Sequence, residues 1–109
     1  MNEIYISPEK YGLREIGELD FSSGAYEFDL LVVWQDVSTR KFFMAEDSGC
    51  SCPLPFGGMG RADLTPTTPT QMRKRAQDRL RDRESWQGQY VTPEDIERLE
   101  RAMRTAITS

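Results

Sequence analysis

A segment of alternating side chains, AYEFDLLVVWQD at 25–36, constrains the fold of this chain more than any other part of the sequence. Apolar residues recur in it with the period of two that a β-strand requires. The members of its wholly apolar face are Tyr26, Phe28, Leu30, Val32 and Trp34. Leu31 and Val33 make the middle of the segment apolar on the opposite face as well. We therefore expect a central strand with other parts of the chain packed on both of its faces.

Further strand patterns lie on either side of this segment. Residues 13–21 predict a strand with a bulge near Gly17, since an isolated glycine inside a strand pattern favours a bulge. The short segment EIYI at 3–6 consists largely of β-prone residues, and we expect a strand there too. Turn chemistry at 36–40 predicts a hairpin loop that leads into a returning strand at 41–46. The N-terminal half should therefore form three or four antiparallel strands.

Helical spacing replaces the strand pattern in the second half of the chain. A helix over about 70–86 is expected to begin at Thr68 or Thr70 as its N-cap, with Pro69 at an early position that needs no N–H. Its thin apolar stripe consists of Met72, Ala76 and Leu80. The residues before it, 57–69, are rich in glycine, proline and threonine and predict a long connector.

A second helix is expected over 93–107. Thr92 is a suitable N-cap, Pro93 takes the first helical position, and Asp95 takes the third, which completes a capping box. The apolar stripe of this helix is Ile96, Leu99, Met103, Ala106 and Ile107. Strands followed by helices predict an α+β fold, in which a three- to four-stranded antiparallel sheet is packed by two C-terminal helices.

The length of the chain, 109 residues, predicts a single domain over 1–109 with one core. The sheet would occupy 1–56, and the connector and the helices would follow. No apolar run approaches the roughly 20 residues that span a bilayer. The N-terminus also lacks the basic and apolar regions of a signal peptide. We therefore expect no membrane association and a location in the cytoplasm, where thiols stay reduced.

The absence of histidine narrows the functions open to this chain. It excludes imidazole metal ligands, histidine general bases, and Ser-His or Cys-His nucleophiles. No spacing of carboxylates indicates a catalytic pair, so we expect neither enzymatic activity nor a cofactor. The net charge of −4 is unevenly distributed, with eleven acids and five bases in 1–69 but six bases and three acids in 70–91. This distribution favours self-association or a mixed-charge partner over broad nucleic-acid binding.

Both cysteines lie in one segment, EDSGCSCPLPFGGMG at 46–60. A structural zinc site needs four ligands, which here would require two chains or nearby carboxylates. A disulfide between the cysteines would close a small, strained ring, and the neighbouring acids oppose a stabilised thiolate. We favour a structural role without a metal, in which the prolines keep the segment extended. Pro53 would then lie on one face, and the opposite face, packed on the core, would hold Cys50, Cys52, Leu54 and Phe56.

The same segment carries a resemblance to a known group of proteins. DSGCSCPLPF follows an apolar strand and its KFFMAE partner. This arrangement resembles an uncharacterised family of small actinobacterial-phage proteins, in which a YEFDLLVVW-like strand leads into a DSGCSCPxPF motif. The similarity covers residues 11–66. It implies a phage provenance for a domain of unknown function, and no catalytic residues come with it.

Arginines recur along the first helix at four-residue spacing, as Arg75, Arg79 and Arg83. Like charges at this spacing repel by a few tenths of a kcal/mol per pair unless anions face them. One interpretation is a solvent-exposed face with salt bridges, and the other is a contact surface for an anionic partner. In the second interpretation, Trp86 or Tyr90 would add an exposed aromatic side chain to that surface.

We therefore expect a small non-enzymatic protein that binds another protein, from host or phage, as an accessory or modulating factor in the host cytoplasm. Homo-oligomerisation is compatible with this expectation. One alternative is a nucleic-acid-associated protein that uses the basic helix at 73–83, whose binding would weaken steeply with salt. Another is a structural or assembly component of a virion, which would self-associate or bind capsid or tail proteins.

Overall fold

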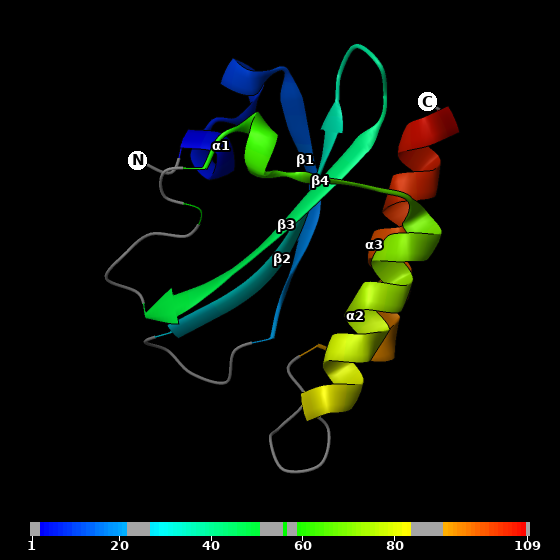
Figure 1. The fold of residues 1–109 in the computed structure, drawn as a ribbon. Helices are drawn as coiled ribbons and strands as arrows, with labels where there is room; N and C mark the ends of the chain where they lie inside the picture. Colours follow the sequence, from blue (N-terminus) through cyan, green and yellow to red (C-terminus); the bar gives the residue numbers. More distant parts are fainter. Residues whose placement is uncertain (1–2, 22–26, 51–55, 57–58, 84–90, 109) are drawn as a thin grey trace.

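The computed structural model describes residues 3–21, 27–50, 56, 59–83 and 91–108 (Figure 1). It has the expected α+β architecture, with a four-stranded antiparallel sheet followed by two C-terminal helices. The strands lie side by side in chain order and are β1 (Leu13–Asp20), β2 (Glu27–Asp36), β3 (Phe42–Cys50) and β4 (Thr65–Thr67). The helices are α1 (Glu3–Ile6), α2 (Pro69–Arg83) and α3 (Pro93–Thr108), with 3-10 turns η1 (Pro8–Tyr11) and η2 (Arg61–Asp63).

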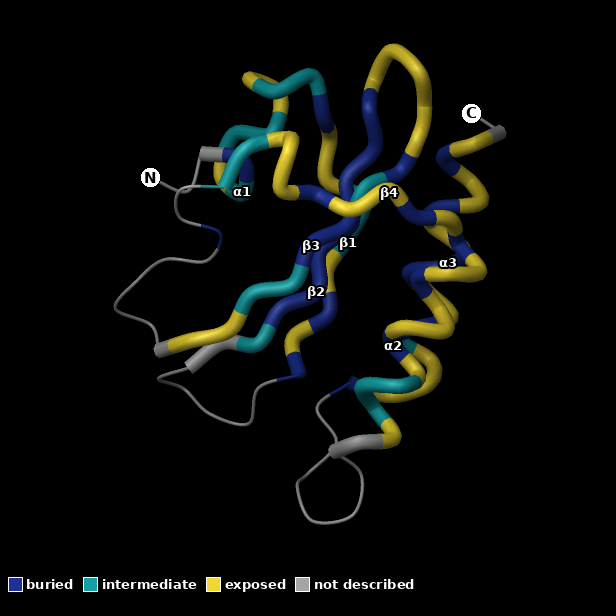
Figure 2. Tube along the Cα trace, in the orientation of Figure 1, coloured by how far each residue is buried: buried dark blue, intermediate teal, exposed yellow. Residues whose placement is uncertain are grey.

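Strand β2 is the central strand that the alternating segment predicts. Its residues from Leu30 onward are buried, and the sheet is covered on both faces (Figure 2). Leu31 and Val33 belong to one core cluster, whereas Val32 and Trp34 belong to another. We call the first face the helix face and the second the aromatic face. The expectation of a strand buried on both sides is confirmed.

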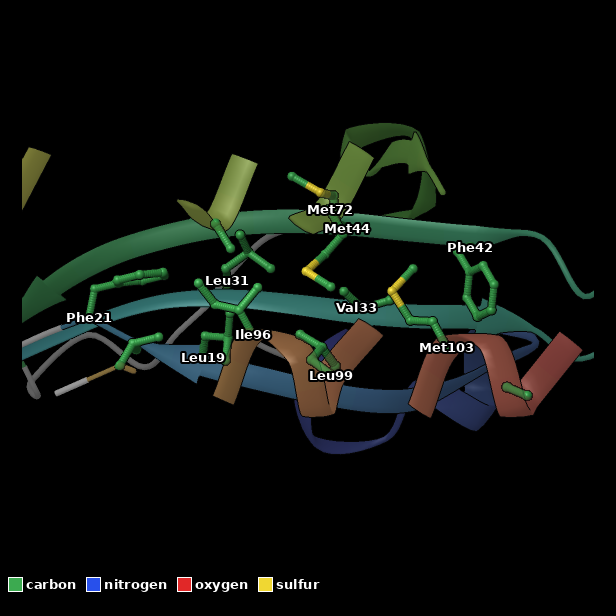
Figure 3. Close-up of a cluster of buried hydrophobic side chains, with 13 residues drawn as sticks. Leu19, Phe21, Leu31, Val33, Phe42, Met44, Met72, Ile96, Leu99 and Met103 are labelled. Atoms are coloured by element: carbon green, nitrogen blue, oxygen red, sulfur yellow. The ribbon is translucent and has the colours of Figure 1, made fainter. Parts of the chain in front are cut away.

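The helix face is packed by α2 and α3 (Figure 3). Its buried residues are Leu19, Phe21, Leu31, Val33, Phe42, Met44, Met72, Ala76, Val91, Ile96, Leu99, Met103 and Ala106. Ile107 does not join them: it is 48% exposed, so its place in the expected stripe is wrong. The last turn of α3 lies at the polar end of β2, where Gln35 Nε2 donates to the carbonyl of Ala106 (3.4 Å). Because β2 has no apolar side chain at that end, Ile107 finds no apolar surface to pack against.

Both long helices begin with side-chain caps. Gln71 N–H donates to Thr68 Oγ1 (3.2 Å), which makes Thr68 the N-cap of α2. Thr92 and Asp95 form the expected capping box, in which Thr92 N–H donates to Asp95 Oδ2 (2.9 Å) and Asp95 N–H donates to Thr92 Oγ1 (3.2 Å). The described part of α2 ends at Arg83, and residues 84–86 of the expected helix lie outside the described residues.

Short segments that precede β1 and follow β3 in the chain cover the aromatic face. The segment at 3–6 is a helix and not the expected strand, because Ile4 is buried against the sheet and tertiary packing overrides β-propensity. Phe56 is also buried there, with Trp34 at 5.5 Å edge-on and Tyr5 at 5.5 Å between ring centroids. The expected connector is partly ordered secondary structure: η2 and β4 lie within it, and β4 pairs with β3.

A bulge in β1 lets one strand serve both faces. The register with β2 shifts between Glu15 and Gly17, as the sequence predicts, so Ile16 is the extra residue. Leu13 and Leu19 would lie on the same face of a regular strand. Because of the bulge, Leu13 packs in the aromatic-face cluster and Leu19 in the helix-face cluster.

Candidate functional site

Arg79 ties α2 to the sheet. Its guanidinium pairs with Asp29 Oδ1 of β2 (2.5 Å) and with Glu46 Oε1 of β3 (2.8 Å), and its central carbon lies 4.5 Å from the ring centroid of Phe21. The Arg79 side chain is only 15% exposed. These contacts belong to a partly buried ion-pair network, and the charge of Arg79 is offset within the chain.

Arg75 extends this network on the more exposed side. Arg75 Nε donates to Glu46 Oε2 (2.8 Å), so Glu46 accepts hydrogen bonds from both arginines. Burial by itself would raise the pKa of Glu46, but the hydrogen bonds from Arg75 and Arg79 outweigh it and hold the pKa below its ordinary value. Arg75 and Arg79 are thus salt-bridged within the chain, but Arg79 is largely buried and not on the solvent-exposed face of the first interpretation, and the contact surface of the second interpretation stays a prediction. The side chain of Arg83, and Trp86 and Tyr90, lie outside the described residues.

Arg61 makes a similar arrangement on the aromatic face, which the sequence did not predict. Its Nη2 lies 2.6 Å from Asp36 Oδ2, its Nη1 donates to the carbonyl of Tyr11 (3.1 Å), and its central carbon lies 5.4 Å from the ring centroid of Phe43. Hydrogen bonds from the Thr39 N–H, from Arg61 and from the Ser38 N–H lower the pKa of Asp36 to about 2. The only available signal was Asp36 itself, because aspartate at the start of a hairpin loop often accepts hydrogen bonds from the backbone.

The cysteine motif is only partly described. Cys50 is the last residue of β3, and its side chain, with Cys52, Pro53 and Leu54, lies outside the described residues. Phe56 is fully buried on the aromatic face, and its N–H donates to Asp47 Oδ2 (2.7 Å). Phe56 is therefore buried, although its φ of 61° is left-handed and not the expected extended conformation, and the roles of the other four motif residues stay predictions.

Neither a metal cluster nor a membrane-crossing helix occurs in the part of the chain that the structure describes. Within that part, no group of three or more cysteine, aspartate or glutamate side chains is placed to hold a metal ion. None of the helices there combines the length and the hydropathy needed to cross a bilayer.

The outer edge of β1 is open in the described parts of the chain, since β1 is the first strand of the sheet and no described strand pairs with its outer side. Phe21 N–H donates to the carbonyl of Asp29 (2.7 Å), which sets the alternation of backbone groups along β1. Leu19 and Gly17 therefore turn their N–H and C=O groups toward β2, and Glu18 turns its groups outward. Outward backbone groups at a sheet edge are a template for pairing with another strand.

A groove runs between this edge and α3. One hollow, of about 470 Å³, lies near Arg14 and is also lined by Thr105. The next, of about 380 Å³, has an apolar floor of Leu19, Val91 and Leu99. Ile16, Arg98 and Ala102 line both hollows, so the two form one β1–α3 groove. Nothing in the sequence pattern marked this groove, because it depends on which edge α3 covers.

Carboxylates line the aromatic-face side of the same edge. Glu15, Glu18 and Asp20, here called the acidic strip, lie opposite Trp34, Val32 and Leu30 of β2. Tyr5 Oη donates to Glu18 Oε1 (2.8 Å). Burial, the hydrogen bond to Glu18 and the charges of the strip raise the pKa of Tyr5, and burial and the charge of Glu18 raise that of Glu15. No salt bridge within the described ranges joins Glu15 or Glu18 to a cation.

The opposite edge of the sheet is protected where β4 covers it, at Phe42, Phe43 and Met44 of β3, and no described strand pairs with the outer side of β3 beyond Met44. Strand β4 has three residues, Thr65–Thr67, and Pro66 at its centre has no N–H to donate. Short edge strands and edge prolines both discourage the addition of another strand. The β1 edge differs from the unpaired part of β3 by the groove beside it, which leaves space for the side chains of an added strand.

The fold and the open edge define a small α+β domain with a strand-edge groove. A family model described as a domain of unknown function, DUF7574, matches residues 1–108, and the chain therefore belongs to this family. No curated protein and no solved structure matches the chain.

Proposed function

We propose that this protein is a small, non-enzymatic phage-type protein that binds another protein, from the host or the phage, as an accessory factor in the host cytoplasm. The open edge of β1 beside the β1–α3 groove carries the proposal, because an extended segment of a partner can add to such an edge as a further strand. Main-chain hydrogen bonds then supply affinity, and the groove supplies selectivity. The phage provenance is supported by the motif resemblance at 47–56.

The nucleic-acid alternative receives less support from the geometry. Three bases of the basic helix already face carboxylates: Arg73 pairs with Glu100 (3.2 Å), and Arg75 and Arg79 pair with Glu46. Binding phosphate with these arginines would require breaking those pairs. The compensated charges favour a protein partner over a phosphate backbone.

An affinity pull-down with a blocked groove tests the proposal. Ala102 is exposed on α3 and lines both hollows, so Ala102→Trp fills the groove without replacing a core residue. Ala62 is exposed on η2 and lines neither hollow, which makes Ala62→Trp the matched control. Tagged wild type and both variants are incubated with bacterial lysate, with and without nuclease, and retained proteins are identified by mass spectrometry. We expect a protein that wild type and Ala62→Trp retain after nuclease treatment and that Ala102→Trp loses.

Other outcomes would favour one of the two alternative functions. Recovery that disappears with nuclease and is unaffected by Ala102→Trp would support the nucleic-acid alternative. With a lysate of phage-infected bacteria, retention of capsid or tail proteins by all three proteins would support the virion alternative. Circular dichroism of each variant verifies that it is folded before its recovery is interpreted.

A further inference from the structure

We infer that the segment which binds in the β1–α3 groove is an extended strand in which basic side chains alternate with small apolar ones. The inference rests on the proposed function, and it adds the chemistry of the partner. The inference follows from a difference between the aromatic-face side and the helix-face side of the β1 edge. The two sides differ in charge and in the space that they leave for side chains of an added strand.

The acidic strip determines one side of the added strand. Residues directly opposite each other in a sheet have their side chains on the same face, and opposite charges there are favourable. Side chains opposite Glu15 and Glu18 would therefore lie on the aromatic-face side, where no described cation pairs with either carboxylate. Lysine or arginine at these alternate positions complements Glu15 and Glu18.

Two of the three cations on the helix-face side of the groove are paired with carboxylates. Arg98 pairs with Asp95 (3.1 Å) and Arg101 pairs with Glu97 (3.3 Å), both within α3. Arg14, at the end of the groove, donates from Nε to Gln35 Oε1 (2.9 Å). The partner of Arg14 is a neutral amide, so its charge is not offset by this bond, but Arg14 lies at the end of the groove and on the opposite face from the acidic strip.

The floor of the groove selects for small side chains. Leu19 and Leu99 form it and are 5% and 6% exposed. A Cβ built on Gly17 would lie 2.7 Å from Leu99 Cδ1, which shows how closely α3 approaches β1. At the position opposite Gly17, alanine or valine on the helix-face side of the added strand suits this close approach.

A second copy of this chain is a poor occupant of the same edge. Two β1 strands that pair about a twofold axis place the acidic strip of one copy opposite the acidic strip of the other. Like charges directly opposite each other destabilise a sheet. The charge of the edge therefore disfavours a homodimer and favours a basic partner.

Three synthetic peptides test the inference on the full chain. The probe is Ac-KVKAKVK-NH2, Ac-EVEAEVE-NH2 reverses its charge, and Ac-KKVAVKK-NH2 keeps its composition but breaks the alternation. Titration is followed by two-dimensional 15N NMR. We expect the probe to give saturable shifts at Gly17, Glu18, Leu19 and Ala102 and to slow amide exchange at Glu18, and the other two peptides to leave these signals unchanged. Equal shifts from the probe and the shuffled peptide would overturn the inference, since they indicate unspecific attraction between charges.

Charge-reversal variants distinguish the effect of the acidic strip on probe affinity from the effect of the protein's net charge. Glu18→Lys is expected to weaken probe binding about tenfold, and Glu15→Lys, which leaves the Tyr5–Glu18 hydrogen bond in place, by a similar factor. Glu9→Lys makes the same charge change at an exposed residue of η1 that lines neither hollow, and it should leave probe affinity within about twofold. Equal weakening by all three variants would contradict the inference.

The outcomes also distinguish this inference from the proposed function. Binding of the acidic peptide in the groove would leave strand addition standing and overturn the basic partner. Loss of a lysate partner in Ala102→Trp, together with no shift from any peptide, would likewise reject only the extended basic strand. A wild-type homodimer in sedimentation that Ala102→Trp abolishes would overturn both, since a second copy would then fill the edge.

Discussion

The two faces of the sheet are closed by different means. On the helix face, α2 and α3 pack their apolar stripes against β2, and the core is mainly aliphatic and methionine side chains. On the aromatic face, short segments from before β1 and after β3 enclose Trp34 and Phe56. Each face also has an arginine that lies over a phenylalanine ring and pairs with an aspartate of β2: Arg79 with Asp29, and Arg61 with Asp36. A sheet face can therefore be closed by short segments, without long helices.

The largest effect is expected from truncating one core side chain on each face. Phe56→Ala should lower the free energy of unfolding by about 4 kcal/mol, because it removes a fully buried ring between Trp34 and Tyr5. Met103→Ala, its counterpart on the helix face, should lower it by about 3 kcal/mol. Both values are measured by urea denaturation. A loss below about 1 kcal/mol for Phe56→Ala alone would show that the short segments cover the aromatic face without stabilising it.

A smaller effect is expected from removing the two arginines. Arg79→Met should cost about 2 kcal/mol, since it leaves Asp29 and Glu46 partly buried without this cation. Arg61→Met should cost about 1 kcal/mol, because the Arg61 side chain is 40% exposed and water can replace it. Arg75→Met, at a half-exposed position, is the control and should cost at most about 0.5 kcal/mol. Equal losses in the free energy of unfolding for Arg79→Met and Arg61→Met would contradict the expectation that the ion pair on the helix face stabilises the fold more.

The smallest effect is expected at acid pH from Asp36 on the aromatic face. The pKa of Asp36 is about 2 in the folded protein against an ordinary value of 3.8. Stability from this carboxylate is therefore present above pH 3.8 and is lost as the pH falls toward about 2. Asp36→Asn should reduce the change in the free energy of unfolding between pH 3.8 and about 2. This free energy is measured by urea denaturation at several pH values. An unchanged curve would mean that the Asp36–Arg61 contact does not stabilise the folded state.

Sequence patterns predicted the elements whose periodicity matches their packing. The alternation at 30–34, the bulge at Gly17 and the capping box at Thr92 each express a local rule, and each is present in the structure. The helix face followed from these rules because amphipathic helices and a strand with two apolar faces require one another.

The aromatic face and the groove were not predictable in the same way. The helix at 3–6 and strand β4 are too short to show a period, and tertiary contacts decide their conformations. The Arg61–Asp36 pair joins residues that are 25 positions apart, so local spacing gives no sign of it. The groove depends on the position of α3 over the edge of β1, which helical periodicity leaves open.

The order in which the two faces are completed has a consequence during synthesis on the ribosome. The aromatic-face cluster needs residues only up to Leu64, so it can form as soon as the sheet emerges. The helix face keeps Leu31 and Val33 in contact with water until α3 has been made, because Ile96, Leu99 and Met103 cover that face. The nascent sheet therefore exposes an apolar surface at a time when chaperones or other nascent chains compete for it.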